Sequence, residues 1–560
     1  MDWPPRSGRS RLRVAGIVAA TVPRRTARKR KVRRIWPPRS GRSRLRAAGS
    51  VGATVSGAQR VKGKCVGFGP RARGDRGYGL RLVSKGILQS EFESVDRADA
   101  LLDISAMLRT PSLRTLIICL AACVFAAQTF AQIGTRFPSE RKVVEDPVTG
   151  HPLIFLTSEP AGDSKIYQTH PQWTADGEWL IFRSSRVPGE AIAVNEETGD
   201  LVQVTEGGYM GMLNIAQKDM YLYLIRDPNS TPGQRPNFPR GDLELVRVHL
   251  EPLFADSKAG SMKDASEYQE VVGIIPAEMG AGGDLAIDAN EDMAYFRVGR
   301  DYAAQYLPEG VEPESNFGPR NMGAGPTGIA KIDLQSGEIG YVVSVPFQAG
   351  HVQANPWVPG EIMFCWETGG NAPQRVWLVN ADGTGLRPIY REHEHDWVTH
   401  EAIITEDEVA IAIMGHVAIS EDEEWSDWGP AGTREWATGL GVVNLRTNEM
   451  RIEGQTKSGS GLWHVHGSPD GRFLVGDDFS RSIYLIDRNT MEMKMISTGH
   501  KPTAADHPHP TFSRCGTKIQ IQSAMLSEDD RSMNIVIIPV PQDWLDREYP
   551  DYELPSGTHR

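Results

Sequence analysis

Histidines recur at one position of a repeated pattern in this sequence. Six of the 14 histidines precede a polar turn that leads into a short apolar segment, and these are His170, His351, His400, His464, His507 and His509. Imidazole is a common ligand of transition metals, and a neutral imidazole is a general base near pH 7. If the repeats bring these side chains together, the sequence predicts a metal site, a proton-transfer site or both.

His464, His507 and His509 are the best candidates for a shared metal ion. His507 and His509 are two residues apart, so on a strand both side chains point to the same face. The alternative for any single histidine is that it bonds to a neighbouring repeat, as polar residues of inner strands often do. Cys515 occupies the position at which other repeats have a turn aspartate, so we expect a turn residue there and not a ligand.

These histidines must be positioned by copies of one sequence motif. In each copy, a polar segment and a small turn lead into a run of apolar residues. The seven copies cover residues 172–182, 215–224, 287–296, 355–364, 403–411, 467–475 and 512–521. Several copies are followed by a second motif with a strand–turn–strand pattern, and the two motifs together make a four-stranded antiparallel unit. This repetition predicts an all-β fold, a seven-bladed β-propeller, rather than an array of β-sandwiches, which needs no equivalent turns. The innermost strands of a propeller line its channel, so equivalent histidines would meet at one end of it. Insertions at 226–242, 299–325 and 416–436 account for the uneven spacing.

The charges divide the chain into two unlike parts. Residues 1–106 hold 25 Lys and Arg against 7 Asp and Glu, a net charge of +18, and the remaining residues carry −28. A basic segment could bind nucleic acid, but this one lacks zinc-ligand spacing and interleaved aromatic residues, so we expect no nucleic-acid partner. We interpret 1–106 as an upstream extension outside the working protein, with a genuine basic arm as the alternative.

A secretory signal follows the basic part. Its regions are a basic segment at Met107–Arg114, an apolar run at Leu116–Ala127 and a small residue, Ala131, before the cleavage point. We therefore predict a signal peptide at 107–131, a mature domain at 132–560, and export to the periplasm or the extracellular space. Leu120–Cys123 resembles a lipoprotein cleavage box, which leaves a lipid anchor as the alternative. No apolar run reaches the ~18 residues of a membrane span.

Several classes of protein lose support. The exported part has only two cysteines, Cys365 and Cys515, which allow one disulfide but not a disulfide scaffold. The sequence has no Gly-x-Ser-x-Gly elbow and no P-loop, which argues against a serine hydrolase or a nucleotidase.

The chain resembles the oligogalacturonate lyases, secreted or periplasmic polysaccharide lyases built on a seven-bladed propeller. The segments that carry the resemblance are Phe364–Gly369, Arg375–Thr384, Thr399–Glu401, Trp463–Gly471 and His507–Pro510. In that family an arginine and a histidine twenty-five residues apart act on the substrate, and Arg375 and His400 have this separation.

The resemblance also implies a manganese-type metal site at His464, His507 and His509, with Ca²⁺ or another divalent ion as alternatives. The family adds a glutamine three residues before His507, where this chain has Ala504. Water, or a residue such as His170 or Gln168, could fill that gap. Together with His351, these two are the expected substrate-binding residues.

The implied activity is metal-assisted β-elimination, which cleaves short oligogalacturonides from pectin into unsaturated uronates. Removing the C5 proton beside an ionised carboxylate places a second negative charge on that group, and a divalent metal would disperse it. His400 would be the general base, and Arg375 would bind a carboxylate. The alternatives are a lyase for another polyuronide and a non-catalytic propeller that binds sugars or serves as a scaffold. The oligomeric state stays open.

Overall fold

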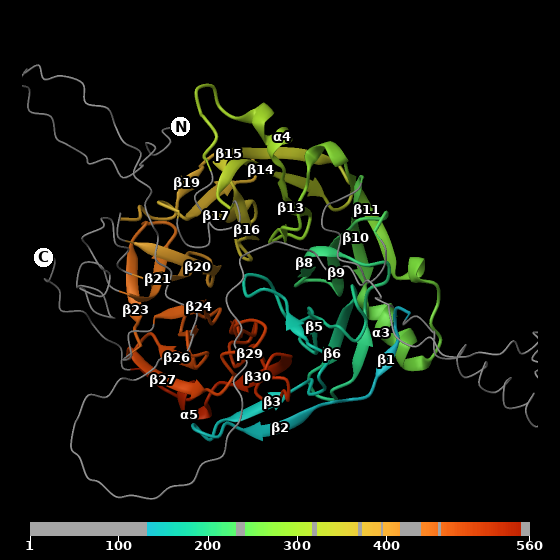
Figure 1. Cartoon of the computed structure of the whole chain (residues 1–560), viewed down its shortest axis with the longest axis vertical. Helices are drawn as coiled ribbons and strands as arrows, with labels where there is room; N and C mark the ends of the chain where they lie inside the picture. The colour runs from blue at the N-terminus through green and yellow to red at the C-terminus, as the bar shows by residue number, and fades with distance from the viewer. Residues whose placement is uncertain are drawn as a thin grey trace, which may run out of the picture. The chain divides into compact units, whose positions relative to one another are not determined.

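The computed structural model describes residues 132–230, 241–315, 322–367, 372–393, 396–414, 438–456 and 461–549. The basic part at 1–106 and the expected signal peptide at 107–131 lie outside the described residues. The described part folds as a ring of seven antiparallel sheets (Figure 1). The expected all-β, seven-bladed propeller is thereby confirmed.

The strands of the seven blades have the following bounds. Blade 1 has β4 (Ser164–Lys165), β5 (Trp179–Arg183), β6 (Ala191–Asn195), β7 (Leu201–Gln203) and β1 (Arg136–Phe137). Blade 2 has β8 (Met210–Ile215), β9 (Tyr221–Arg226), β10 (Leu243–His249) and β11 (Gln269–Ile275). Blade 3 has β12 (Leu285–Ile287), β13 (Met293–Val298), β14 (Ala324–Asp333) and β15 (Ile339–Phe347). Blade 4 has β16 (Ala349–Ala354), β17 (Glu361–Trp366), β18 (Val376–Asn380) and β19 (Arg387–Pro388).

The remaining blades complete the ring. Blade 5 has β20 (Trp397–Ile403), β21 (Glu408–Met414), β22 (Gly439–Asn444) and β23 (Met450–Gly454). Blade 6 has β24 (Leu462–Gly467), β25 (Phe473–Asp478), β26 (Ile483–Asp487) and β27 (Glu492–Ser497). Blade 7 has β28 (Thr511–Phe512), β29 (Lys518–Ser523), β30 (Asn534–Pro539), β3 (Pro152–Phe155) and β2 (Lys142–Glu145).

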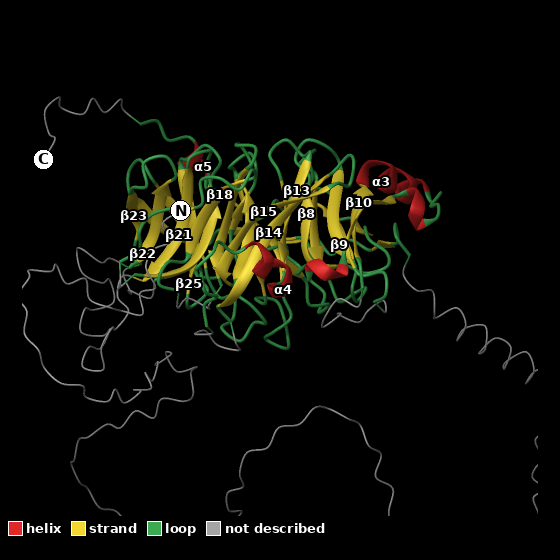
Figure 2. Ribbon diagram, turned by 90° about the horizontal axis from the view of Figure 1, so that it is seen from above, coloured by secondary structure: helices red, strands yellow, loops and turns green. Residues whose placement is uncertain are grey.

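Short helices lie in the connections. They are α3 (Leu250–Ala259), α4 (Arg300–Ala303), α5 (Gln542–Leu545), η1 (Ala265–Glu267), η2 (Ala277–Met279) and η3 (Ala304–Tyr306). Seen along the rim, α3 and α5 lie at one end of the strands and α4 at the other (Figure 2). Among the described residues, no helix has both the length and the apolar character that crossing a bilayer requires.

Blade 7 joins the two ends of the described chain. Its inner strands come from the C-terminal part, and its outer strands β2 and β3 come from the N-terminal part. The joint is the antiparallel pairing of Ile154 and Phe155 with Ile537 and Val536. Because every blade then has neighbours on both sides, the ring has no open end at which another chain could pair.

The apolar core consists of layers between adjacent blades. Each layer takes side chains from the facing sheets of two blades: Val376 of blade 4 packs in one layer with Val409 of blade 5, and Ala410 packs with Leu474 of blade 6. Strands such as β6 and β25 are buried along their full length because they are covered on both faces.

The repeated turn has the same hydrogen bonds in different blades. In the first copy Asp176 accepts bonds from the Thr174 hydroxyl at 2.5 Å and from the amide of residue 178 at 3.0 Å. Cys515 takes the aspartate's place in the last copy, 3.2 Å from the Ser513 hydroxyl. Cys515 is an exposed free thiol and Cys365 a buried one, so the disulfide that the sequence allowed does not form.

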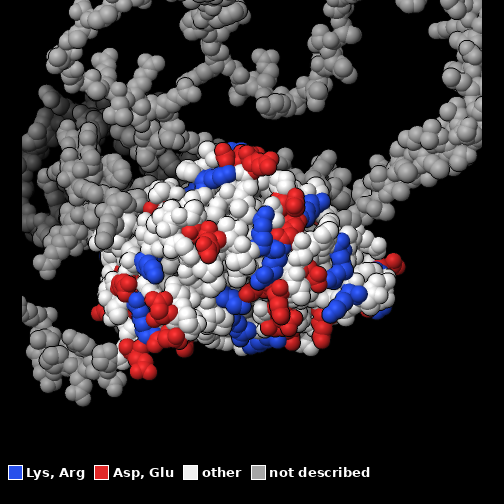
Figure 3. All heavy atoms as spheres, turned by 90° about the horizontal axis from the view of Figure 1, so that it is seen from below, with Lys and Arg blue, Asp and Glu red and all other residues white. Residues whose placement is uncertain are grey.

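The long insertions connect strands whose adjoining ends lie at the same end of the propeller as the histidines, and residues 231–240, 316–321 and the whole of 416–436 lie outside the described residues. The segments 226–242, 299–325 and 416–436 each join the second strand of a blade to its third. The second strand ends beside the start of the innermost strand, as the pairing of Asp477 with His464 shows. The rim itself carries acidic and basic side chains intermingled, without a single-sign patch in the view of Figure 3.

Candidate active site

Bulges at the start of innermost strands set the direction of three histidines. The register shifts between Gly350 and Gln353 in β16, between Val398 and His400 in β20, and between Leu462 and His464 in β24. A bulge sets two residues against one and re-aims the side chains there. The histidines therefore do not follow the simple alternation of their strands.

Two of the site histidines have a left-handed backbone. His351 has φ 50° and His509 has φ 52°. This region costs a non-glycine residue about 1–3 kcal/mol and is common at functional sites. The contacts of the two side chains must offset this cost.

Four imidazoles from two blades and one connection form a cluster. The ring of His464 lies 3.7 Å from that of His509, 4.3 Å from that of His400 and 5.2 Å from that of His507, measured between centroids. His464 and His509 are buried. Burial is the main reason that the pKa of His464 falls to about 3, so this imidazole is neutral.

Asp477, at the end of β25, orients two of these rings. Its carboxylate lies 3.0 Å from Nδ1 of His464 and 3.1 Å from Nδ1 of His507. Burial acts to raise the pKa of Asp477, but His464 and His507 outweigh it and hold that pKa well below its usual range. Because an ionised carboxylate only accepts hydrogen bonds, both Nδ1 atoms carry the proton and both Nε2 atoms keep a free lone pair.

The ring of His509 is also oriented by a contact at Nδ1, but its partner is Gln168 instead of Asp477. Its Nδ1 lies 3.1 Å from Oε1 of Gln168, and the Gln168 amide nitrogen donates to the carbonyl of Val465 at 3.3 Å. Nε2 of His509 is buried and makes no hydrogen bond in the described part of the chain. It lies 3.1 Å from Oδ2 of Asp506, the residue before His507. One potential ligand atom each of His464, His507 and Asp477 lies within 4.8 Å of the others, and the His509–Asp506 pair lies beside them. Imidazole nitrogens and carboxylate oxygens are donors that suit a divalent transition metal.

A second cluster surrounds Arg375. The Arg375 Nε donates to Glu401 at 2.9 Å, and its Nη2 lies 3.8 Å from Glu367. His351 lies 2.8 Å from Glu401 and 3.5 Å from Glu367. Burial acts to lower the pKa of His351, but the hydrogen bond and charge of Glu401 raise it overall. The charges of this cluster therefore largely cancel.

Tyr167 lies between the two clusters. Its ring is 5.0 Å from that of His351 on one side and 5.0 Å from that of His509 on the other. Burial is the main reason that the pKa of Tyr167 lies well above its usual value, and the charge of Glu401 adds to the effect. Tyr167 therefore holds its proton throughout the neutral range.

His400 belongs to the imidazole cluster and is close enough to Arg375 to be influenced by its charge. Its ring lies 4.7 Å from Trp463, and its Nδ1 lies 3.2 Å from the hydroxyl of Thr399. Burial, followed by the nearby His464 and Arg375, lowers the pKa of His400 well below 6.5. His400 is therefore a neutral imidazole before any ligand binds.

Known proteins resemble this chain in part of its sequence and in its fold. No model of a protein family matches it. It is 21% identical over 209 residues to the oligogalacturonide lyase of Pectobacterium atrosepticum, which covers 33% of this chain and 49% of that protein. The chain thus spans about half the length of the curated relative that it matches.

Two solved structures cover far more of it. Each of the two alignments covers 74% of this chain and 100% of the other chain. The first structure is an oligogalacturonate lyase in complex with manganese (18% identity, TM-score 0.55). The second is an oligogalacturonate lyase from Vibrio parahaemolyticus (17% identity, TM-score 0.56). The fold is that of the oligogalacturonate lyases. The resemblance to these lyases that the sequence indicated is confirmed.

Most residues that the resemblance to oligogalacturonate lyases singled out lie together. His400, His464, His507 and His509 form one cluster, His351 and Arg375 belong to the adjoining one, and Gln168 contacts His509. Their roles stay predictions.

His170 and Ala504 differ from expectation. Both ring nitrogens of His170 are engaged, one by the Thr169 hydroxyl at 2.7 Å and one by the Leu285 carbonyl at 2.8 Å, so His170 joins blades instead of facing a ligand. Ala504 packs against Ala524 and Met533, so the position of the oligogalacturonate lyase glutamine belongs to a small apolar cluster here.

Sequence reasoning missed four residues of the site. Glu401 directly follows His400, but its burial against Arg375 depends on the fold. Asp477 faces His464 across a hairpin, and this pairing could have been found from the strand register. Nothing in the local sequence distinguishes Asp506 or Tyr167.

Proposed function

We propose that the protein is a lyase that cleaves short oligogalacturonides by metal-assisted β-elimination. The observation that carries this proposal is that His464, His507 and His509 cluster next to a neutral His400 and near a buried arginine. A non-catalytic, sugar-binding propeller does not require a neutral base beside the metal-type donors, whereas a lyase for another polyuronide would use the same groups and stays the alternative.

The residues that would hold the ion are His464, His507 and His509, with Asp506 as the oxygen ligand. We infer that Asp506 does here what a glutamine does in other family members, because its carboxylate and not Ala504 lies beside Nε2 of His509. A bound divalent ion, Mn²⁺ before Ca²⁺ or another ion, would stabilise the second negative charge that forms on the uronate carboxylate. Gln168 and Asp477 would hold the rings in place.

His400 would take the C5 proton at Nε2, since its Nδ1 faces Thr399. A neutral imidazole is the form that can accept a proton, and burial keeps His400 in this form. A low pKa also makes a weaker base. Uronate carboxylates in the channel would raise that pKa on binding, because a negative charge favours the imidazolium.

Arg375 would contact the substrate through its terminal nitrogens. The Arg375 Nε donates to Glu401, and the side chain is only 2% exposed. Not all of the guanidinium N–H groups are therefore free to bind a substrate carboxylate, contrary to what the sequence suggested. Nη1 and Nη2 make no hydrogen bond to the described residues, which leaves them for one carboxylate oxygen. Glu401 and Glu367 would fix the guanidinium in that orientation.

Tyr167 is our candidate for the proton donor to the departing glycosidic oxygen. It keeps its proton and lies between His509 of the imidazole cluster and His351 of the arginine cluster. Tyr167→Phe should lower kcat for oligogalacturonide, and a substrate with a far better leaving group at C4 should recover most of the loss. Equal losses for both substrates would rule out this role.

The decisive experiment measures the ultraviolet absorbance of unsaturated product formed from di- to tetragalacturonate, with and without a chelator. Wild-type protein should form product, and the chelator should stop the reaction. His400→Ala should lower the rate by 10²–10⁴-fold, the usual contribution of a general base. The control is His249→Ala, which removes a histidine that pairs with Glu270 far from the cluster in sequence. Product formation at the wild-type rate by His400→Ala would overturn the proposal.

We further propose that the protein is exported after cleavage behind Ala131. N-terminal sequencing of the protein secreted from its host should start at Gln132. A lipid-modified Cys123 at the start would support the anchored alternative, and an uncleaved chain would contradict both.

A further inference from the structure

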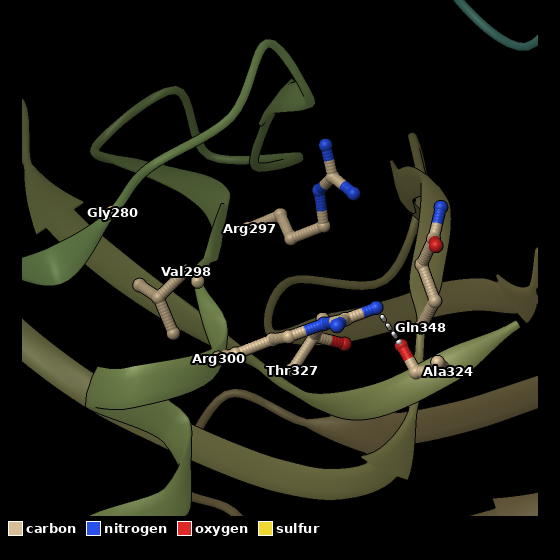
Figure 4. Close-up of a pocket in the computed structure, with 8 residues that line it drawn as sticks. Gly280, Arg297, Val298, Arg300, Ala324, Thr327 and Gln348 are labelled. Atoms are coloured by element: carbon tan, nitrogen blue, oxygen red, sulfur yellow. Dashed lines mark hydrogen bonds between the residues drawn. The ribbon is translucent and has the colours of Figure 1, made fainter. Parts of the chain in front are cut away.

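A hollow opens at the junction of blades 3 and 4, at the same end of the propeller as the histidines. It has a cavity volume of about 210 Å³. Its walls include Arg297, Arg300, Thr327, Gln348, Gly280 and Gly299. Among the described residues, the lining holds two arginines and no carboxylate. Figure 4 shows the guanidinium of Arg297 and the amide of Gln348 on opposite sides of the opening, with Arg300 below them.

Arg297 lines this hollow, and its guanidinium is held in place by its neighbours. Its Nε lies 2.8 Å from the carboxylate of Asp284, and its Nη1 donates to the carbonyl of Ala349 at 3.4 Å. Gly282 leaves room for it, because a Cβ at that position would lie 2.4 Å from Nη2. The backbone is therefore shaped around this guanidinium, whose charge Asp284 partly balances.

Arg300 supplies the charge that is not balanced. Its Nη2 donates to the Ala324 carbonyl at 3.1 Å, the bond drawn in Figure 4. No carboxylate within the described ranges pairs with Arg300, although the part of the chain after residue 106 carries −28 overall. A guanidinium with free N–H groups favours a carboxylate, which it can bind through two parallel hydrogen bonds.

The hollow adjoins the proposed catalytic cluster through one short segment. Gln348 lies three residues before His351, and its carbonyl accepts from the amide of Glu367 at 2.9 Å. Glu367 in turn lies 3.5 Å from His351 and 3.8 Å from Arg375. The Gln348–His351 segment thus connects the wall of the hollow to the cluster around Arg375.

We propose that this hollow is a uronate-binding subsite, which holds the carboxylate of a sugar outside the pair whose bond is cleaved. The inference rests on the proposed function and adds a substrate length to it. Arg300 binds the carboxylate, Arg297 fixes the wall, and the Gln348 amide faces the sugar hydroxyls. Three or more linked uronates should therefore bind better than two.

The test compares di-, tri- and tetragalacturonate with the full chain and two charge-matched variants. Arg300→Gln should raise KM for the trimer about tenfold, which corresponds to ~1.4 kcal/mol, and leave KM and kcat for the dimer unchanged. Arg451→Gln is the control, because it removes the same charge from β23, where Arg451 pairs with Glu408 and Glu453. This control variant should leave KM and kcat unchanged for both substrates.

Calorimetric titration of trigalacturonate is run alongside, so that binding is judged apart from cleavage. The subsite is overturned if trigalacturonate binds Arg300→Gln as tightly as it binds wild type. It is also overturned if Arg300→Gln changes KM by the same factor for the dimer and the trimer. A wild-type protein that binds the trimer through Arg300 without forming unsaturated product keeps the subsite and overturns the lyase proposal instead.

Discussion

Asp477 decides which nitrogens of the imidazole cluster are free. It is a fully buried carboxylate that accepts from Nδ1 of both His464 and His507. This one side chain therefore sets the tautomer and the ring orientation of two proposed ligands. Gln168 does the same for His509 with a neutral amide.

Replacing Asp477 by asparagine should weaken metal binding without removing a ligand. The amide has a similar size but can turn its NH₂ toward a ring, which would free the wrong nitrogen. Partners of this kind usually contribute 10–100-fold to metal affinity, so we expect a loss of that size in calorimetric titration with Mn²⁺. Asp470→Asn is the matched control, since Asp470 lies in the turn at the other end of the same hairpin. Equal affinities for wild type and Asp477→Asn would contradict the orienting role.

Glu392 should make stability depend on pH. Its side chain is buried beside the backbone of Arg375, and burial is the main reason that its pKa rises to about 8. The unfolded chain loses this proton near pH 4.5, so between pH 4.5 and 8 the folded state binds one proton more. Stability should therefore be highest below that window and fall as the pH rises through it.

Thermal unfolding measured between pH 5 and 8 tests this prediction. The Tm of wild type should fall more steeply with pH than that of Glu392→Gln, which cannot ionise. Parallel curves for the two proteins would show that Glu392 is ionised in the folded state.

At the scale of elements, two features of the strands position the site. Bulges in β20 and β24 accompany the contact between His400 and His464, and a bulge in β16 accompanies the placement of His351 beside Glu401. The pairing of β3 with β30 closes the ring and so keeps blades 1 and 7 in contact, on which Gln168 and His509 depend. Loss of this joint should affect both stability and the cluster.

Phe155 is the residue with which to test the joint. It is 0% exposed in the core of blade 7, so Phe155→Ala should lower the free energy of unfolding by about 3–5 kcal/mol. Val143→Ala on the adjacent β2 is the control, because Val143 is 57% exposed and such changes stay within about 0.5 kcal/mol. Denaturant unfolding followed by tryptophan fluorescence measures both. Similar losses for the two variants would mean that the joint contributes little.

At the scale of the whole molecule, charge opposes the proposed substrate. Residues 107–560 carry −28 in total, and the rim in Figure 3 shows acidic and basic groups intermingled. An acidic sugar is therefore repelled at long range and attracted only near Arg375, Arg300 and the proposed ion.

We expect kcat/KM for oligogalacturonide to rise when salt is raised from low ionic strength to about 0.15 M. The screening length is then about 8 Å, which removes the long-range repulsion before it weakens buried contacts. Initial rates at limiting substrate in a series of NaCl concentrations measure this. A steady fall from the lowest salt onward would show that exposed cations such as Arg300 dominate the encounter.

The sequence by itself determined the repeat and hence the fold. Polar turns such as Thr174–Gly177 and the apolar runs after them are local patterns, so they can be recognised without the structure. Their repetition predicted seven blades and a shared end for the histidines, because equivalent positions in a closed ring must converge.

Only the tertiary structure decided what surrounds each histidine. His170 precedes the equivalent turn of another repeat, yet it bonds to Leu285 of blade 3, while His464 lies beside His509 and Asp477. The difference arises from contacts between blades that are far apart in the chain. Burial of Arg375 against Glu401 and the arginine hollow beside Gln348 have the same origin. Such contacts depend on how blades pack once the ring is closed, and no periodicity within one segment records them.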